Sequence, residues 1–135
     1  MAREAYVTGV GQSEVGVRLP RHPLLLTVDA VKEALDDAGL TLDQIDGVFS
    51  FPGKSTGYLA FSPVGTDDLI EVLNIKSKWQ MGAMEQPAQL SAIAMAAWAV
   101  KEGICRHVIC FRTVYEAGGM ANPAEYMPLQ QKTTS

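Results

Sequence analysis

The stretch Leu90-Ser-Ala-Ile-Ala-Met-Ala-Ala-Trp-Ala-Val100, together with His107-Val-Ile-Cys-Phe-Arg-Thr-Val114, decides the fold class of this chain. The first segment lies in a helix predicted over residues 86–101, and it is apolar almost all the way round. A helix without a polar face is normally buried on all sides. The second segment is apolar without alternation, as in a strand covered on both faces of its sheet. The pair predicts an α/β domain in which helices enclose the sheet.

Helical spacing also marks a long helix that begins at Pro23. Its apolar residues recur every three to four positions, and proline suits a first helical turn. Gly39 suits the position just after the last turn, where a positive φ favours glycine.

Shorter elements complete the order of the chain. We expect strands over residues 4–10, 48–51 and 76–81, a single helical turn with a capping box at residues 41–44, and a short helix capped by Thr66-Asp-Asp68. The alternation of strands and helices predicts a mostly parallel sheet with right-handed crossovers and helices on both faces. Residues 1–114 form this domain, and residues 115–135, rich in Gly, Pro and Gln, form an irregular tail.

The composition excludes several classes of protein. A chain of 135 residues is an ordinary size for one domain. Its net charge of −4 and pI of about 5.1 disfavour a nucleic-acid-binding module, which needs a basic excess. No apolar run reaches the length of a membrane span, and the N-terminus lacks the hydrophobic core of a secretory signal. Two cysteines cannot build a disulfide framework, so we expect a cytoplasmic protein.

The pair Gly9-x-Gly11 after the first predicted strand invites a dinucleotide-binding interpretation. That fingerprint requires a third glycine where this chain has Glu14, and it requires a helix that begins there. Here the helical period sets in about ten residues later. The favoured interpretation is a tight turn after a strand.

The histidines and cysteines give no metal site, because none has a second ligand at the required spacing. We expect His22 in a surface loop and His107 bonded to the backbone where a strand opens. Cys110 is expected in the core and Cys105 in a more exposed turn, and neither has the surroundings of a nucleophile.

The most informative segment for function is Gly82-Ala-Met-Glu-Gln-Pro-Ala-Gln-Leu-Ser-Ala-Ile93. A strand leads here into a tight turn that opens directly into the buried helix. The first residues of such a helix project side chains and free N–H groups into any pocket above the sheet. The residues alone support a binding site and a plain buried helix start equally.

The order and spacing of several segments resemble the N-terminal part of the thiolase superfamily. The likeness extends from about residue 6 to residue 119, and it is strongest to the branch of thiolase-like lipid-transfer proteins, sterol carrier protein thiolases and steroid side-chain aldolases. The segments that carry it are Tyr6-Val-Thr-Gly-Val-Gly-Gln-Ser-Glu-Val-Gly16, Leu26-Thr-Val-Asp-Ala-Val-Lys-Glu-Ala-Leu-Asp-Asp-Ala-Gly-Leu40, Asp43-Gln-Ile-Asp-Gly-Val48, residues 90–103 and residues 107–112. The resemblance implies the first of two similar halves of the family fold.

The resemblance also implies where chemistry would occur. It sets Gln86 at the position of the family's nucleophilic cysteine, with Met84 and Glu85 beside the substrate. An amide is not a nucleophile, so Gln86 cannot form a thioester intermediate, but its N–H can donate to a thioester carbonyl or enolate oxygen. We therefore expect a thiolase-like component that handles acyl-CoA thioesters, by acyl transfer or retro-aldol cleavage. The alternative is a non-catalytic acyl-CoA-binding or lipid-transfer subunit that stabilises a partner.

The resemblance further implies an incomplete site, because the family's histidine and second-cysteine motifs have no counterpart here. A second thiolase-like half, a homodimer formed through residues 76–81, or a small OB-fold, zinc-ribbon-type protein would be the partner. Coenzyme A enters as part of the thioester substrate, and no permanently bound cofactor is expected.

Overall fold

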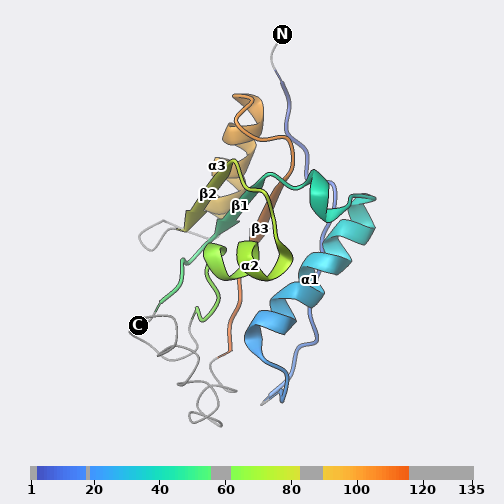
Figure 1. Cartoon of the computed structure of the whole chain (residues 1–135), viewed down its shortest axis with the longest axis vertical. Helices are drawn as coiled ribbons and strands as arrows, with labels where there is room; N and C mark the ends of the chain where they lie inside the picture. The colour runs from blue at the N-terminus through green and yellow to red at the C-terminus, as the bar shows by residue number, and fades with distance from the viewer. Residues whose placement is uncertain (1–2, 18, 56–61, 83–89, 116–135) are drawn as a thin grey trace.

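A computed structural model describes residues 3–17, 19–55, 62–82 and 90–115. The described chain contains alternating helices and strands (Figure 1). In chain order these elements are α1 (Pro23–Ala38), the 3₁₀ turn η1 (Leu42–Gln44), β1 (Gly47–Ser50), α2 (Thr66–Leu73), β2 (Trp79–Gly82), α3 (Leu90–Lys101) and β3 (Val108–Phe111). Of the predicted tail, all but residue 115 lies outside the described residues. None of the described helices is long and apolar enough to cross a membrane.

The three strands form one parallel sheet in the order β2-β1-β3. In the register of the sheet, Val48 of β1 lies between Gln80 of β2 and Ile109 of β3. Parallel neighbours need crossover connections, and α2 and α3 supply them. The predicted α/β class with a parallel sheet is therefore confirmed.

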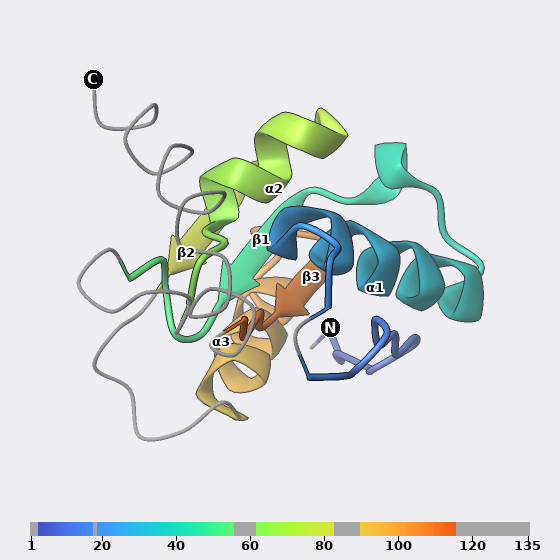
Figure 2. The same ribbon diagram turned by 90° about the horizontal axis from the view of Figure 1, so that it is seen from below.

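Helices cover both faces of the sheet, with α1 and α2 on one side and α3 on the other (Figure 2). Because side chains alternate along a strand, Val48 and Phe49 of β1 enter different cores, and neither has any exposed surface. Val48 packs among residues of α1 and α2, whereas Phe49 packs with Ala92 of α3 and makes a tilted ring contact with Trp79. The central strand is thus anchored from both sides.

The predicted long helix is confirmed as α1, and its ends follow local chemistry. Pro23 occupies the first turn, and the His22 side chain caps the helix by accepting a hydrogen bond from the Leu24 N–H. Gly39 ends the helix with φ of +68°, a conformation that glycine adopts at little cost. In the following turn, the Thr41 N–H donates to the Gln44 side chain at 2.9 Å, as the capping-box pattern predicts.

The predicted first strand, residues 4–10, is not a strand in the structure. Residues 3–17 instead form an extended segment, here called the N-terminal arm, that runs along α1 (Figure 1). Two backbone N–H groups of the arm donate to α1 carboxylates: Val10 to Asp37 at 2.9 Å and Gln12 to Glu33 at 3.2 Å. Two backbone N–H groups of this β-prone segment therefore donate to side chains of a helix, and not to a neighbouring strand.

The two glycines of the arm lie directly against the α1 backbone. A Cβ on Gly9 would collide with the Ala34 carbonyl oxygen, and a Cβ on Gly11 would collide with that of Ala30. The expected tight turn after a strand is therefore wrong. Glycine is required here because it allows two backbones to approach closely.

Burial at α3 and β3 differs from the sequence prediction. Only Ala92, Ala96 and Ala99 of α3 are buried, while its outer side chains reach solvent. Strand β3 is half-exposed, because it forms an edge of the sheet and the arm does not pair with it. The burial of the two cysteines is the reverse of the prediction, because Cys105 is buried and Cys110 is exposed.

A polar clamp joins the amino ends of the strands. The Asp46 carboxylate accepts hydrogen bonds from the backbone N–H groups of Arg106 and His107 at 3.0–3.1 Å. The Asp46 carbonyl accepts from the Lys78 N–H at 2.7 Å, and the His107 carbonyl accepts from Gly47 at 3.2 Å. Asp46 therefore connects the starts of β2 and β3 to β1.

Candidate functional site

The candidate site lies at the carboxyl ends of the strands, the edge of an open parallel sheet where ligands usually bind. Strand β2 ends at Gly82, and α3 begins at Leu90. The segment that connects them contains Met84, Glu85 and Gln86, and it lies outside the described residues. The roles of these three residues therefore stay predictions, and the following paragraphs concern the described residues at the same edge of the sheet.

The loop that follows β1, here called the rim, is held in place by two buried serines that share one acceptor. The Ser50 hydroxyl donates to the Pro52 carbonyl at 2.9 Å, and the Ser62 hydroxyl donates to the same oxygen at 3.1 Å. The Ser55 N–H donates to the Ser62 carbonyl at 3.0 Å. Both hydroxyl protons are used in fixing the loop, so these serines shape the rim and are not poised as nucleophiles.

A partly buried ion pair lies beside this loop. The Lys54 ammonium is 3.0 Å from the Asp68 carboxylate, and both side chains are largely covered. Asp68 also accepts a hydrogen bond from the Gly65 N–H at 2.7 Å, which caps the start of α2. The predicted acidic cap is confirmed, with Gly65 instead of Thr66 at the cap position. Asp68 thus joins the rim loop to α2.

His22 occupies the same end of the molecule, at the start of α1. Its Nδ1 accepts from the Leu24 N–H at 3.1 Å, so in the neutral ring the proton resides on Nε2. Nε2 is buried and has no hydrogen-bond partner among the described residues. Burial lowers the pKa of His22, and the negative charge of Asp68 opposes that shift. The predicted surface-loop role is wrong, because His22 is a partly buried helix cap.

The carboxyl end of β3 is tied to α1 by a chain of hydroxyl groups. The Thr27 hydroxyl donates to the Pro23 carbonyl at 2.8 Å, and it lies 2.5 Å from the hydroxyl of Thr113. Since a hydroxyl has one proton, Thr113 must be the donor of the second bond. Both threonines are buried, and this contact fixes the chain that leaves the sheet.

This end of the sheet therefore contains the unpaired Nε2–H donor of His22, the ion pair of Lys54 and Asp68, and several hydroxyl groups whose positions are fixed by hydrogen bonds. The hydroxyl groups and the ion pair hold the loops at this end of the sheet in place. Sequence reasoning placed His22 in a surface loop and gave Lys54 no role, since isolated polar residues in loops carry no periodic signal. The one available signal was His22 immediately before Pro23, the sequence of a helix cap followed by its first turn.

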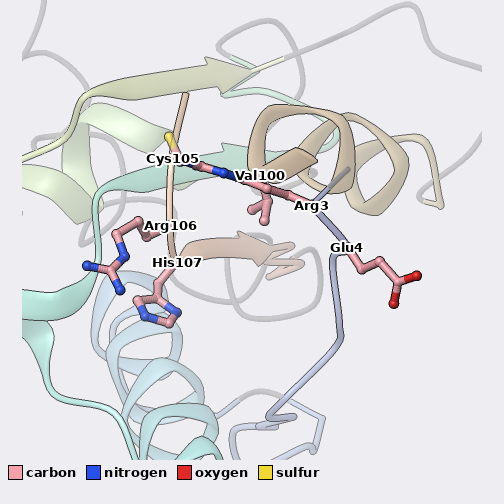
Figure 3. A pocket seen from close by; sticks show the side chains of 6 residues that line it. All are labelled: Arg3, Glu4, Val100, Cys105, Arg106 and His107. Carbon is pink, nitrogen blue, oxygen red and sulfur yellow. The ribbon is translucent and has the colours of Figure 1, made fainter. Parts of the chain in front are cut away.

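A separate pocket of about 610 Å³ lies at the other end of the sheet, near the amino end of β3 (Figure 3). It is lined by Arg3, Glu4, Val100, Cys105, Arg106 and His107. The Glu4 side chain points away from Cys105 and His107 (Figure 3). Burial raises the pKa of Cys105, and the charge of Asp46 raises it further, so this thiol is not an activated nucleophile. The pocket thus lies at the opposite end of the strands from their carboxyl ends.

Comparisons with known proteins point to one kind of enzyme. The chain is 29% identical over 116 residues to a steroid side-chain-cleaving aldolase of Thermomonospora curvata, covering 86% of this chain and 28% of that protein. It is 28% identical over 120 residues to a 17-hydroxy-3-oxo-4-pregnene-20-carboxyl-CoA lyase of Mycobacterium tuberculosis, covering 89% and 30%. No family model matches the chain.

A solved structure agrees with these relatives. A chain of an Ltp2-ChsH2(DUF35) aldolase superposes with a TM-score of 0.74 at 27% identity, over 92% of this chain and 32% of that one. The chain spans about three tenths of the length of the curated relatives that it matches. It is therefore similar, in sequence and in fold, to a portion of steroid side-chain-cleaving aldolases.

Proposed function

We propose that this chain is part of an aldolase that breaks a carbon–carbon bond in a β-hydroxyacyl-CoA thioester. The observation that carries the proposal is the agreement of sequence and fold with two curated relatives and one solved structure, all aldolases or lyases. The open carboxyl edge of the sheet supports the proposal, because polar side chains of the described residues line the loop that follows β1.

The reaction needs no nucleophile from this chain. A base removes the proton of the substrate hydroxyl, the adjacent carbon–carbon bond breaks to give a ketone, and its electron pair passes into a thioester enolate. Protonation of that enolate gives the shortened acyl-CoA. The transition state therefore places negative charge on the thioester oxygen, and an N–H donor that faces this oxygen lowers the barrier.

Gln86 is the residue that we assign to that task, with Met84 and Glu85 beside the acyl chain. An amide N–H stabilises an enolate without covalent bonding, which fits an aldolase better than an acyltransferase. The base and the remaining walls of the site come from further polypeptide, either a second thiolase-like half or an OB-fold partner.

The test is a Gln86→Ala substitution in the complex as purified from cells that express the chain with its partner. Removal of one donor to an oxyanion costs about 10²–10³-fold in turnover. Cleavage of a β-hydroxyacyl-CoA is followed by mass spectrometry of the ketone and the shortened thioester. Gln12→Ala is the matched control, since Gln12 lies exposed on the N-terminal arm.

Unchanged turnover in Gln86→Ala would remove the catalytic role of that residue. A complex that binds acyl-CoA but cleaves none would support the alternative, a non-catalytic carrier subunit. Size-exclusion chromatography with mass identification of co-purifying chains tests the need for a partner. A fully active monomer of this chain would contradict the incomplete site.

A further inference from the structure

Two arginines from separate parts of the chain line the pocket at the amino end of the strands (Figure 3). Arg3 belongs to the N-terminal arm, and Arg106 belongs to the turn between α3 and β3. Neither guanidinium forms an ion pair within residues 3–17, 19–55, 62–82 and 90–115. The whole chain has a net charge of −4, so its composition does not account for two unpaired cations at one pocket.

Arg3 lies against the end of α3. Gly103 leaves space for its guanidinium, because a Cβ on Gly103 would lie 2.7 Å from the Arg3 Nη1 atom. The carbonyls of Trp98, Ala99 and Val100 at this end of the helix already accept backbone hydrogen bonds of 2.9–3.1 Å. The guanidinium of Arg3 is therefore not needed to cap α3, and it can serve a ligand.

Two acidic groups lie near the pocket, and neither neutralises the arginines. The Glu4 side chain points away from Cys105 (Figure 3), and its carboxylate accepts a hydrogen bond from the Tyr6 hydroxyl at 2.5 Å. Burial and the charge of Asp46 raise the pKa of the Cys105 thiol, whereas the charge of Lys78 lowers it. The charge of Lys78 thus opposes that of Asp46 at this wall of the pocket, and the charges of the arginines remain.

The charge and shape of these groups favour a phosphate as the ligand. A guanidinium presents a planar fork of N–H donors that matches phosphate oxygens. A phosphate monoester has a charge of about −1.5 to −2 at pH 7, which matches two arginines better than a single carboxylate does. The imidazole of His107 lines the same pocket and adds a further N–H donor.

The size of the pocket indicates that the ligand is larger than a free phosphate ion. Its volume of about 610 Å³ lies within the range of about 300–1,000 Å³ that is usual for small-molecule sites. The side chain of Val100 and the thiol of Cys105 give it an apolar wall. The ligand therefore combines a phosphate group with an organic part.

We infer that this pocket binds a small phosphate monoester, with Arg3 and Arg106 as the charged contacts of its phosphate group and His107 as a further donor. The inference is a binding site without a chemical step. It does not depend on the proposed reaction, because the pocket lies at the opposite end of the strands from the candidate site.

The test is a titration of the isotopically labelled chain, followed by the NMR signals of its backbone amides. The probes are inorganic phosphate, phenyl phosphate and benzoate. We expect the amides of Gly103, Arg106 and His107 to shift with either phosphate, and those of Gly65 and Asp68 at the far end of the sheet to stay in place. Phenyl phosphate should bind most tightly, because its ring contacts the apolar wall, and benzoate should bind at least about tenfold more weakly than phenyl phosphate.

Substitutions connect the shifts to the arginines. Arg3→Gln and Arg106→Gln should each weaken phenyl phosphate binding by about tenfold, the usual loss for one hydrogen bond to a charged group. Lys32→Gln is the matched control, because it also removes one positive charge but lies exposed on α1. The two arginines belong to different segments, so each variant tests the site independently, and circular dichroism checks that each variant is folded.

Several results would overturn the inference. Amides of the pocket that do not respond to millimolar phenyl phosphate would remove the site. Equal losses in Lys32→Gln and the arginine variants would show a general effect of net charge, and equal binding of benzoate would remove the preference for phosphate. Calorimetry on the complex with a co-purifying partner provides the last check, since loss of phosphate binding there would mean that polypeptide with acidic side chains fills the pocket instead.

Discussion

The Oδ1 atom of Asp46 lies 3.0 Å from the backbone nitrogen of His107 and accepts its hydrogen bond. The same carboxylate accepts from the Arg106 N–H. It thereby ties the start of β3 to the residue that precedes β1, across sixty positions of sequence. A side chain thus continues the hydrogen bonding of the sheet beyond the last backbone pair.

Replacement of Asp46 by alanine should destabilise the fold by about 1–3 kcal/mol, because two backbone donors lose a charged acceptor. Asp46→Asn retains one oxygen acceptor and should lose less. Urea unfolding measures both effects, with Asp36→Ala as the control, since Asp36 lies exposed on α1. Equal midpoints for the Asp46→Ala and Asp36→Ala variants would show that the clamp contributes nothing.

The Gly11→Ala substitution should detach the N-terminal arm from α1. The added methyl group would collide with the Ala30 carbonyl, and the arm must move to relieve it, at a cost of roughly 1–3 kcal/mol. Hydrogen exchange at Val10 and Gln12 should speed up, since their N–H groups lose their carboxylate acceptors.

Gly16→Ala provides the matched control for the arm. A methyl group there meets only the side chain of Leu19, which can turn aside. The two variants should therefore differ clearly in protection of the arm. Similar exchange rates in both would mean that the close approach of arm and helix does not hold the arm in place.

The stability of the fold should decrease as the pH falls below about 6.5, the usual pKa of histidine. Burial lowers the pKa of His22 in the folded chain, so the unfolded chain binds its proton more readily, and acid favours unfolding. His22→Asn keeps a good helix cap and removes this contribution. The free energy of unfolding, measured from pH 7.5 to pH 5, should fall more steeply in the wild type than in this variant.

The two buried threonines should respond unequally to replacement by valine. Thr27→Val leaves the hydroxyl proton of Thr113 without an acceptor and should lower the free energy of unfolding by about 1–3 kcal/mol. Thr113→Val leaves the hydrogen bond from Thr27 to Pro23 intact and should lower it by less. The double variant should lose less than the two single losses combined, since no orphaned donor remains. Equal and additive losses would contradict the assigned direction of this hydrogen bond.

Local chemistry explains why parts of the fold could be predicted from the sequence. Helix α1 begins at Pro23, whose ring fixes φ, and it ends at Gly39, which adopts a positive φ. Neighbouring elements alter neither of these properties. The capped start of α2 follows likewise from acidic residues near a helix N-terminus. Such features are properties of a few consecutive residues, and they are confirmed.

Burial could not be predicted in the same way, because it depends on which elements become neighbours. The run from His107 to Val114 has the composition of a central strand, yet the central strand is β1 and Val114 is half-exposed. Cys105 is buried because it packs under the turn at Asp46, far away in sequence. The same reason explains the N-terminal arm, because its β-prone residues lie along α1 and do not pair with a strand.

Of the candidate site, the sequence predicts the strand and the apolar helix on either side, which are β2 and α3. The segment between them, which contains Gln86, lies outside the described residues, and its role stays a prediction. The surrounding rim could not be foreseen, because Ser50, Ser62 and Thr113 come from segments far apart in the chain.

The clamp at Asp46 also has a consequence for how such a chain can vary. The amino ends of the strands are joined mainly through backbone groups and one carboxylate, so mutational drift in the loops at the opposite edge need not loosen the sheet. The loops at that edge can thus change in sequence while the scaffold persists. The two ends of one small sheet are free to evolve at different rates.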